Sequence, residues 1–116
     1  MDKRIAFLKK QMLSNLQYST TIEEMARLVN LSESHLQQLF KMEIGMSPIQ
    51  YLKHLRLETA RDLLENSFNQ VKQIGFEVGM IDQSHFVRQF KKKYSLTPSE
   101  YRKKFWESIE VKENGN

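Results

Sequence analysis

The sequence predicts an all-α fold of about seven helices. Apolar residues recur at three- and four-residue spacing along almost every segment, which is the helical period rather than the alternation of a strand. Glycine and proline are scarce, with four and two residues in a chain of 116. A third observation is an internal repeat. Residues 34–41 (SHLQQLFK) return as residues 84–91 (SHFVRQFK), so one helical unit is used twice.

The repeat extends beyond these eight residues and keeps its distance. Ser47-Pro48 returns as Thr97-Pro98 and Tyr51 as Tyr101, always 50 residues further along the chain. Apolar positions alternate with polar or basic positions in both copies. The repeat therefore includes a core and also the surface that this core supports.

The first two helices are predicted from apolar stripes. The first lies within residues 3–17, and its stripe consists of Ile5, Leu8, Met12, Leu13 and Leu16. Residues 21–24 (TIEE) form a capping box, in which a hydroxyl and a carboxylate satisfy each other's end of the helix backbone. A short second helix follows, and its buried face consists of Ile22, Met25, Ala26 and Val29.

The third and fourth helices are predicted from their caps. Ser32 caps a helix that runs to about Met42, with Leu36, Leu39 and Phe40 on its core face. After Gly45, residues 47–50 (SPIQ) combine an N-cap, a proline at the first helical position and a glutamine at the third. They begin the longest helix, which extends to about Glu65.

The last three helices repeat this pattern. Val71, Ile74 and Val78 line a fifth helix that Gly79 ends, and Asp82 caps a sixth helix with Phe86 and Phe90 inward. Residues 97–100 (TPSE) begin the seventh helix. The apolar stripe fades beyond Glu107, so residues 108–116 are expected to form a disordered tail.

A short helix, a tight turn and a second helix with an apolar inner face and a polar outer face make a helix-turn-helix unit. The first unit is predicted at about residues 20–47 and the second at about residues 69–97. A linker helix at about residues 48–65 joins them within one DNA-binding domain, residues 1–107. We expect an asymmetric DNA site, because the two outer faces differ.

The outer faces carry residue types that recognise base edges in the major groove. Arginine pairs with guanine, glutamine with adenine, and valine packs on a thymine methyl group. The residues predicted to face bases are Ser34, Gln37 and Gln38 in the first unit, and Gln83, Ser84, Val87 and Arg88 in the second. Lysines further along each helix are placed for phosphates. They are Lys41, Lys91 and Lys92.

Over residues 4–105 the chain resembles the DNA-binding domain of the AraC/XylS family of bacterial transcription regulators. In the second unit the resemblance rests on Ile74, Gly79, Asp82, Ser84, Phe86, Phe90, Lys91, Thr97, Pro98 and Tyr101. In the first unit and the linker it rests on Ala26, Ser32, Leu36, Phe40, Lys41, Gly45, Ser47, Pro48, Tyr51, Leu52, Arg56, Leu57, Ala60 and Leu64.

The resemblance implies two homeodomain-like helix-turn-helix units and a recognition helix in each of two adjacent major grooves. Three positions depart from the usual pattern of the family. Gly75 replaces alanine between the two helices of the second unit, Ser95 replaces glycine after the recognition helix, and Met80 replaces an aromatic residue in the turn. Glycine inside a helix costs about 1 kcal/mol relative to alanine, so a looser second unit is expected.

Several function classes find no support in the sequence. Cysteine is absent, which excludes disulfides and thiolate chemistry. No nucleophile–base set, glycine-rich phosphate loop or carboxylate pair is recognisable, so we expect no enzyme and no cofactor. His35 and His85 lie at equivalent positions beside the core without a ligand cluster, so no metal site is predicted. Without a secretory signal or a membrane-spanning run, we expect a cytoplasmic protein.

The charge distribution favours an anionic partner. The net charge is +4, but three glutamates and one lysine make the last ten residues net −2, which leaves +6 on residues 1–106. Double-stranded DNA is the expected partner. RNA polymerase at promoters and an N-terminal sensor domain outside this sequence are further expected partners. The alternatives are a helical module whose basic face binds an acidic protein or a membrane surface, and an RNA-binding module.

Overall fold

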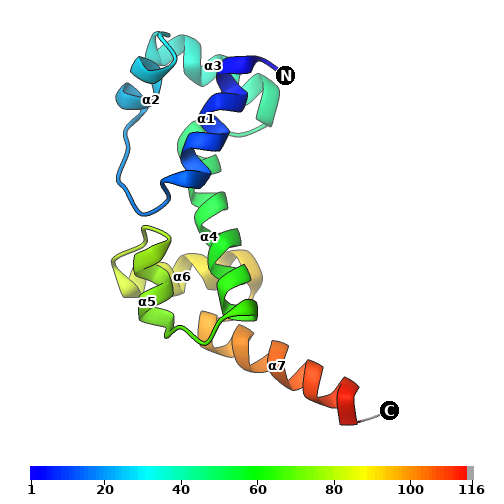
Figure 1. Cartoon of the computed structure of the whole chain (residues 1–116). Coiled ribbons are helices and arrows are strands. Elements are labelled where there is room, and N and C mark those ends of the chain that lie inside the picture. The colour runs from blue at the N-terminus through cyan, green and yellow to red at the C-terminus, as the bar shows by residue number, and fades with distance from the viewer. Residues whose placement is uncertain (115–116) are drawn as a thin grey trace. The chain divides into compact units, whose positions relative to one another are not determined.

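Seven α-helices and no strand make up the part of the chain that the structure describes. The computed structural model describes the backbone of residues 1–114 and the side chains of residues 1–110. The helices are α1 (Lys3–Ser14), α2 (Ile22–Leu28), α3 (Glu33–Ile44), α4 (Pro48–Asn66), α5 (Val71–Glu77), α6 (Gln83–Tyr94) and α7 (Pro98–Asn114) (Figure 1). The all-α prediction is confirmed. None of the described helices has the length and apolar character needed to span a membrane.

The helix ends differ from the sequence prediction at two places. α1 ends at Ser14, three residues before the predicted limit, and it has an N-cap that the pattern did not reveal, Asp2. α7 continues to Asn114, although the apolar stripe fades after Glu107. The helix therefore extends into the segment where we expected a tail, and residues 115 and 116 lie outside the described residues.

The chain divides into two compact units, Met1–Arg56 and Leu57–Asn116. α1, α2, α3 and the first part of α4 form unit 1, and the rest of α4 with α5, α6 and α7 forms unit 2. Each unit has a buried cluster of its own. The division follows the internal repeat, because each copy supplies one supporting helix, one recognition helix and the helix that comes next.

Side-chain caps fix most of the helix starts. The hydroxyl of Ser47 accepts the Gln50 backbone N–H at 3.2 Å, and the Gln50 amide oxygen accepts the Ser47 N–H at 3.1 Å. Thr97 and Glu100 exchange the same two bonds at 3.2 and 2.9 Å. The helix starts predicted at residues 47–50 and 97–100 are confirmed, and both are capping boxes.

At α2, where a capping box was also predicted, only one of its two hydrogen bonds forms. The Thr21 hydroxyl accepts the Glu24 backbone N–H at 3.1 Å, as expected. The Glu24 carboxylate, however, accepts the hydroxyl of the preceding residue, Thr20, at 3.4 Å. The reciprocal carboxylate bond was therefore wrongly predicted, because a second hydroxyl lies beside the helix start and competes for Glu24.

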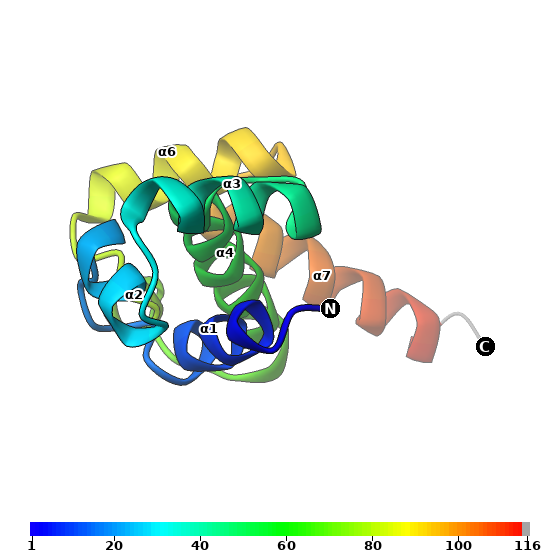
Figure 2. The same cartoon turned by 90° about the horizontal axis from the view of Figure 1, so that it is seen from above.

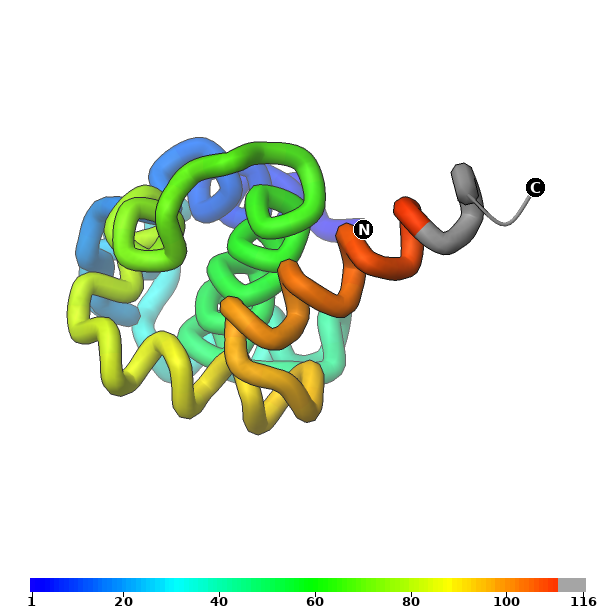
Figure 3. The backbone as a smooth tube through the Cα atoms, turned by 90° about the horizontal axis from the view of Figure 1, so that it is seen from below, coloured from blue at the N-terminus to red at the C-terminus, as the bar shows by residue number. Residues whose placement is uncertain are grey.

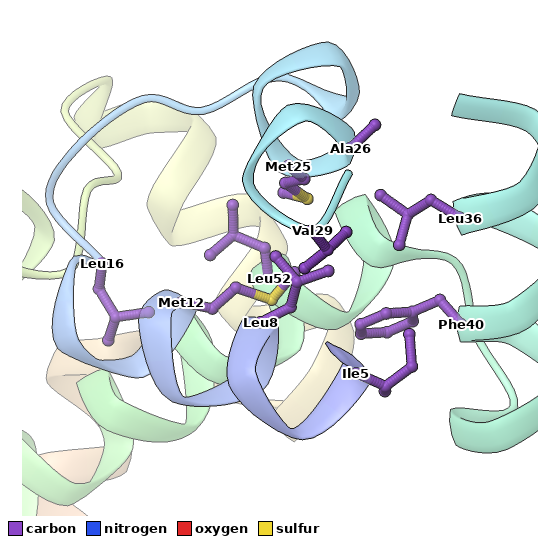
Figure 4. Close-up of a cluster of buried hydrophobic side chains, with 10 residues drawn as sticks. All are labelled: Ile5, Leu8, Met12, Leu16, Met25, Ala26, Val29, Leu36, Phe40 and Leu52. Carbon is purple, nitrogen blue, oxygen red and sulfur yellow. The ribbon is translucent and has the colours of Figure 1, made fainter. Parts of the chain in front are cut away.

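The core of unit 1 contains side chains from all four of its helical segments (Figure 4). Its buried members are Ile5, Leu8, Met12, Leu16, Met25, Ala26, Val29, Leu36, Phe40 and Leu52. Leu13, which we assigned to the stripe of α1, is 57% exposed. It lies one residue after Met12, and a step of about 100° around a helix carries it off the buried face.

The core of unit 2 is built in the same way around aromatic rings. Its buried members are Leu57, Ala60, Leu64, Ile74, Val78, Met80, Phe86 and Phe90. Tyr101 packs edge-on against Phe90, with 5.7 Å between the ring centroids. Its counterpart in unit 1, Tyr51, packs against Phe40 with 5.5 Å between the centroids. The Tyr101 hydroxyl donates to Glu65. Burial and this hydrogen bond raise the pKa of Tyr101 to about 12.

The turns of the two helix-turn-helix units differ by one residue. In unit 1 the Leu31 N–H donates to the Ala26 carbonyl at 3.0 Å, and in unit 2 the Met80 N–H donates to the Gly75 carbonyl at 2.8 Å. These pairs are 49 residues apart, whereas the caps Ser32 and Asp82 are 50 apart. The extra residue is Ile81, which is 72% exposed. Figures 2 and 3 follow the backbone through these turns.

An arginine fastens the connection before the supporting helix in each unit. In unit 1, Arg56 donates to the carbonyls of Leu16 and Tyr18 at 3.0 and 3.2 Å. In unit 2, Arg102 makes four such bonds of 2.6–3.4 Å, to the carbonyls of Leu63, Leu64, Ser67 and Asn69. In each unit a single arginine side chain thereby donates hydrogen bonds to carbonyl groups of the loop after one helix, and in unit 2 also to carbonyl groups at the end of that helix.

We predict that Arg102→Ala lowers the free energy of unfolding of unit 2 by roughly 2 kcal/mol, because several partly buried carbonyls lose their donor. Urea unfolding followed by the fluorescence of Trp106, the one tryptophan of the sequence, measures this loss. Lys103→Ala is the matched control, since Lys103 is exposed on the same helix. Equal stabilities of the Arg102→Ala and Lys103→Ala variants would contradict the prediction.

Candidate nucleic-acid interface

The recognition helix of unit 1, α3, is held from one side and exposed on the other. Leu36 and Phe40 are completely buried, and they lie four residues apart on one helix face. The four side chains of this helix that we predicted to contact DNA are all exposed. They are Ser34, Gln37, Gln38 and Lys41.

α6 repeats this arrangement in unit 2. Phe86 and Phe90 are completely buried. Of the side chains predicted to contact DNA, four are exposed and two are half-buried. The exposed ones are Ser84, Arg88, Lys91 and Lys92, and the half-buried ones are Gln83 and Val87. Unit 1 therefore brings its four predicted residues together on the face opposite its core. In unit 2 the four exposed residues lie opposite the core, while Gln83 and Val87 lie at its edge.

The two recognition helices carry different charges. α6 contains Arg88 and three consecutive lysines from Lys91, and no acidic residue. α3 contains one lysine, Lys41, against Glu33 and Glu43. The Glu43 carboxylate accepts the Asp2 backbone N–H at 2.9 and 3.1 Å. Any polyanion that meets both helices is therefore attracted chiefly by α6.

The two histidines of the repeat are exposed, although we placed them beside the core. The backbone N–H of His35 donates to Ser32 at 3.1 Å, and that of His85 donates to Asp82 at 3.0 Å. Because residues three apart share a helix face, the side chains accompany Gln38 and Arg88. They are additional candidates for DNA contact. The capping residue three positions earlier is the sequence signal that locates them.

The starts of α4 and α7 follow the two recognition helices. At each start, a side chain of the helix itself accepts a hydrogen bond from a backbone N–H group. At α7, hydrogen bonds from Thr97 hold the pKa of the Glu100 carboxyl below its usual range, and the charge of Lys91 adds to this effect. A carboxylate therefore lies at the positive end of α7. At α4 the corresponding side chain is the neutral amide of Gln50.

Among the described residues, no group of three or more acidic or histidine side chains is arranged to hold a metal ion.

Two of the departures from the family pattern lie at the turns of unit 2. Met80, which stands where the family usually has an aromatic residue in the turn, is only 6% exposed. Ser95 occupies the left-handed region with a φ of 70°, where unit 1 has Gly45 at 90°. This conformation costs an L-residue about 1 kcal/mol.

Comparison with known proteins identifies the architecture. A family model described as a helix-turn-helix domain matches residues 25–104, which run from α2 into α7 and include parts of both units. The chain is also similar to the lactose operon transcription activator of Staphylococcus xylosus, with 37% identity over 92 residues. That alignment covers 79% of this chain and 33% of the activator. The chain belongs to the AraC/XylS family.

Solved structures of AraC-type domains have the same fold. A transcriptional regulator from Chromobacterium violaceum, described as an AraC-type DNA-binding domain protein, matches with a TM-score of 0.82 and 28% identity. The match covers 89% of this chain and 92% of that one. The DNA-binding domain of AdpA, solved with a target DNA, matches with a TM-score of 0.84 over 88% of this chain and 92% of that one. At 22% identity, this second likeness concerns the fold.

We predict that Thr97→Ala lowers the free energy of unfolding by about 1 kcal/mol and leaves DNA affinity unchanged once the folded fraction is taken into account. The reason is that the Thr97–Glu100 box already satisfies the start of α7 without a phosphate. Thermal unfolding and DNA titration of the same variant check both parts. An unchanged melting temperature with a several-fold loss of affinity would instead place the start of α7 in the DNA interface.

Proposed function

We propose that residues 1–107 form a DNA-binding domain that recognises double-stranded DNA by sequence, as part of a bacterial transcription regulator. α3 and α6 each enter one of two adjacent major grooves. The observation that carries the proposal is the repeated helix with two fully buried side chains and a polar or basic face opposite them. A helix of this kind fits the width of the major groove, and its supporting helix stays behind it.

The proposed base contacts follow from the chemistry of the exposed side chains. Arg88 donates two parallel hydrogen bonds, which suits guanine, and Gln37 and Gln38 suit adenine. Ser34 and Ser84 are short and accept several base edges. Gln83 and Val87, at the edge of the core, approach a base from the side, with Val87 packing on a thymine methyl group.

The proposed phosphate contacts are Lys41 on α3, and Lys91 and Lys92 on α6. Phosphate contacts set the position of a protein on DNA and supply the salt-dependent part of its affinity. Because the lysines at the end of α6 outnumber the single lysine of α3, we infer that unit 2 supplies most of this salt dependence.

The regulator as a whole requires further parts. The chain spans about a third of the length of the curated relatives it matches. We therefore propose that a signal-sensing domain accompanies this one in the complete regulator. At promoters we propose RNA polymerase as a second partner. Such a regulator acts in the cytoplasm, where bacterial DNA lies.

Selection of bound sites from random duplex DNA tests the proposal directly. The expected result is an asymmetric preferred sequence, because the outer faces of α3 and α6 differ. Footprinting by one monomer on that sequence is expected to protect two segments about 10 bp apart on one face of the duplex. A module that binds an acidic protein or a membrane would select no sequence at all. A palindromic site occupied only by dimers would contradict the proposed tandem arrangement.

We predict different consequences for the two kinds of contact on α6. Arg88→Ala is expected to cost about 1 to 3 kcal/mol on the preferred site and to relax the preference at one base pair. Lys91→Ala is expected to weaken binding to all sequences alike and to lower the slope of log affinity against log salt by about one unit. Titrations of both variants over a range of salt concentrations measure these effects.

The matching variant in unit 1 is Gln38→Ala. It is expected to relax the preference in the other segment of the site, by less than Arg88→Ala does, because an uncharged hydrogen bond is weaker than a charged one. Equal and sequence-independent losses from Arg88→Ala and Lys91→Ala would show that Arg88 contacts the backbone rather than a base.

A further inference from the structure

Gly75 of α5 lies where the supporting helix and the recognition helix of unit 2 come closest. A methyl group at this position would lie 3.0 Å from the Met80 carbonyl oxygen and 3.0 Å from Cδ2 of Phe86. It would also lie 3.3 Å from Oε1 of Gln83, the first residue of α6. All three distances are tighter than ordinary carbon contacts, which begin near 3.5 Å. The space of the missing side chain is therefore occupied by α6 and its turn.

Unit 1 provides an internal comparison. The residue equivalent to Gly75 is Ala26, because both accept the corresponding turn hydrogen bond. The bond is 3.0 Å long at Ala26 and 2.8 Å long at Gly75. The residue equivalent to Gln83 is Glu33, which is exposed, whereas Gln83 is half-buried. With a methyl group on the supporting helix, the first side chain of the recognition helix lies in solvent. Without one, it lies against that helix.

We propose that Gly75 is a positioning residue that fixes the Gln83 side chain at the start of α6 and thereby sets the base preference of unit 2. This inference rests on the proposed function, in which Gln83 faces a base. A glutamine amide selects a base only when its donor and acceptor are held in one orientation. The contact with Gly75 restrains that amide before DNA arrives, so less conformational entropy is lost on binding.

The inference explains why a helix-weakening residue occurs at a buried helical position. Gly75→Ala gains helix propensity, and it also forces Gln83 away from α5 or moves the turn by a few tenths of an ångström. A purely structural role of Gly75 affects stability alone. A positioning role changes the base preference in the segment that α6 contacts and leaves the α3 segment unaltered.

The test compares four proteins: the wild type, Gly75→Ala, Gln83→Ala and the double variant. Dissociation constants are measured on the preferred site and on every single base-pair change within it. Gly75→Ala is expected to alter discrimination about three- to tenfold at one base pair of the α6 segment. In the Gln83→Ala background the same change is expected to add nothing, because its effect runs through Gln83. Ala26→Gly is the matched control, which lowers stability without altering either segment's preference.

Two results overturn the inference. One is an effect of Gly75→Ala on base preference that persists in the Gln83→Ala background, which would mean that a shift of the turn or of α6 is responsible. The other is a change in thermal stability with no change in preference. In both cases the wild type still selects a sequence, so the proposed function stands while the role of Gly75 falls.

A measurement without DNA separates the two proposals. In the free wild-type chain, nuclear Overhauser cross-peaks are expected between the Gln83 amide protons and the Gly75 α-protons, and Gly75→Ala is expected to remove the contacts of Gln83 with α5. Absence of the wild-type cross-peaks refutes the positioning contact whatever the DNA results are. If the cross-peaks are present but the chain selects no sequence, the proposed function fails, and the assigned effect on specificity fails with it.

Discussion

Each recognition helix depends on two side chains, one helical turn apart, that water does not reach. These are Leu36 and Phe40 in α3, and Phe86 and Phe90 in α6. Their burial fixes the rotation of the helix about its own axis, and this rotation decides which side chains remain outside. Hydrophobic burial has no preferred direction of its own. Two apolar residues four positions apart lie on one side of a helix, however, so burying both of them allows only one rotation of that helix. The whole proposed interface follows from this restraint.

α4 supplies core residues to both units, so one helix continues the repeat from the first unit to the second. Leu52 belongs to the cluster of unit 1, while Leu57 and Ala60 belong to that of unit 2. Fifty residues after Leu57 and Ala60, α7 presents Glu107 and Glu110, which are both exposed. Burying unpaired carboxylates at these two positions would be costly, so α7 does not repeat the apolar pattern of α4 there.

The two units are similar in plan but differ in their chemistry. Unit 2 has a glycine in its supporting helix, an extra residue in its turn, a strained Ser95 and a strongly basic recognition helix. Unit 1 has an alanine, a shorter turn, Gly45 at the corresponding bend and a recognition helix with more acidic than basic residues. A tandem repeat whose copies have diverged in this way suits an asymmetric ligand. In the proposed function, unit 2 supplies most of the electrostatic attraction and both units supply selectivity.

The sequence by itself determined the class, the order of the helices and most of their starts, because periodicity and caps such as Ser47–Gln50 act between neighbours in the chain. It also determined most of the side chains of α3 and α6 that face outward, although Gln83 and Val87 are half-buried and the two histidines placed beside the core are exposed. Tertiary structure decided what depends on distant contacts. Glu24 accepts a hydrogen bond from Thr20, and Leu13 is exposed. Arg102 donates hydrogen bonds to carbonyl groups of a loop that lies more than thirty residues earlier in the chain. The approach of α6 to Gly75 is of the same kind, because it depends on the packing of two helices rather than on the pattern within either one.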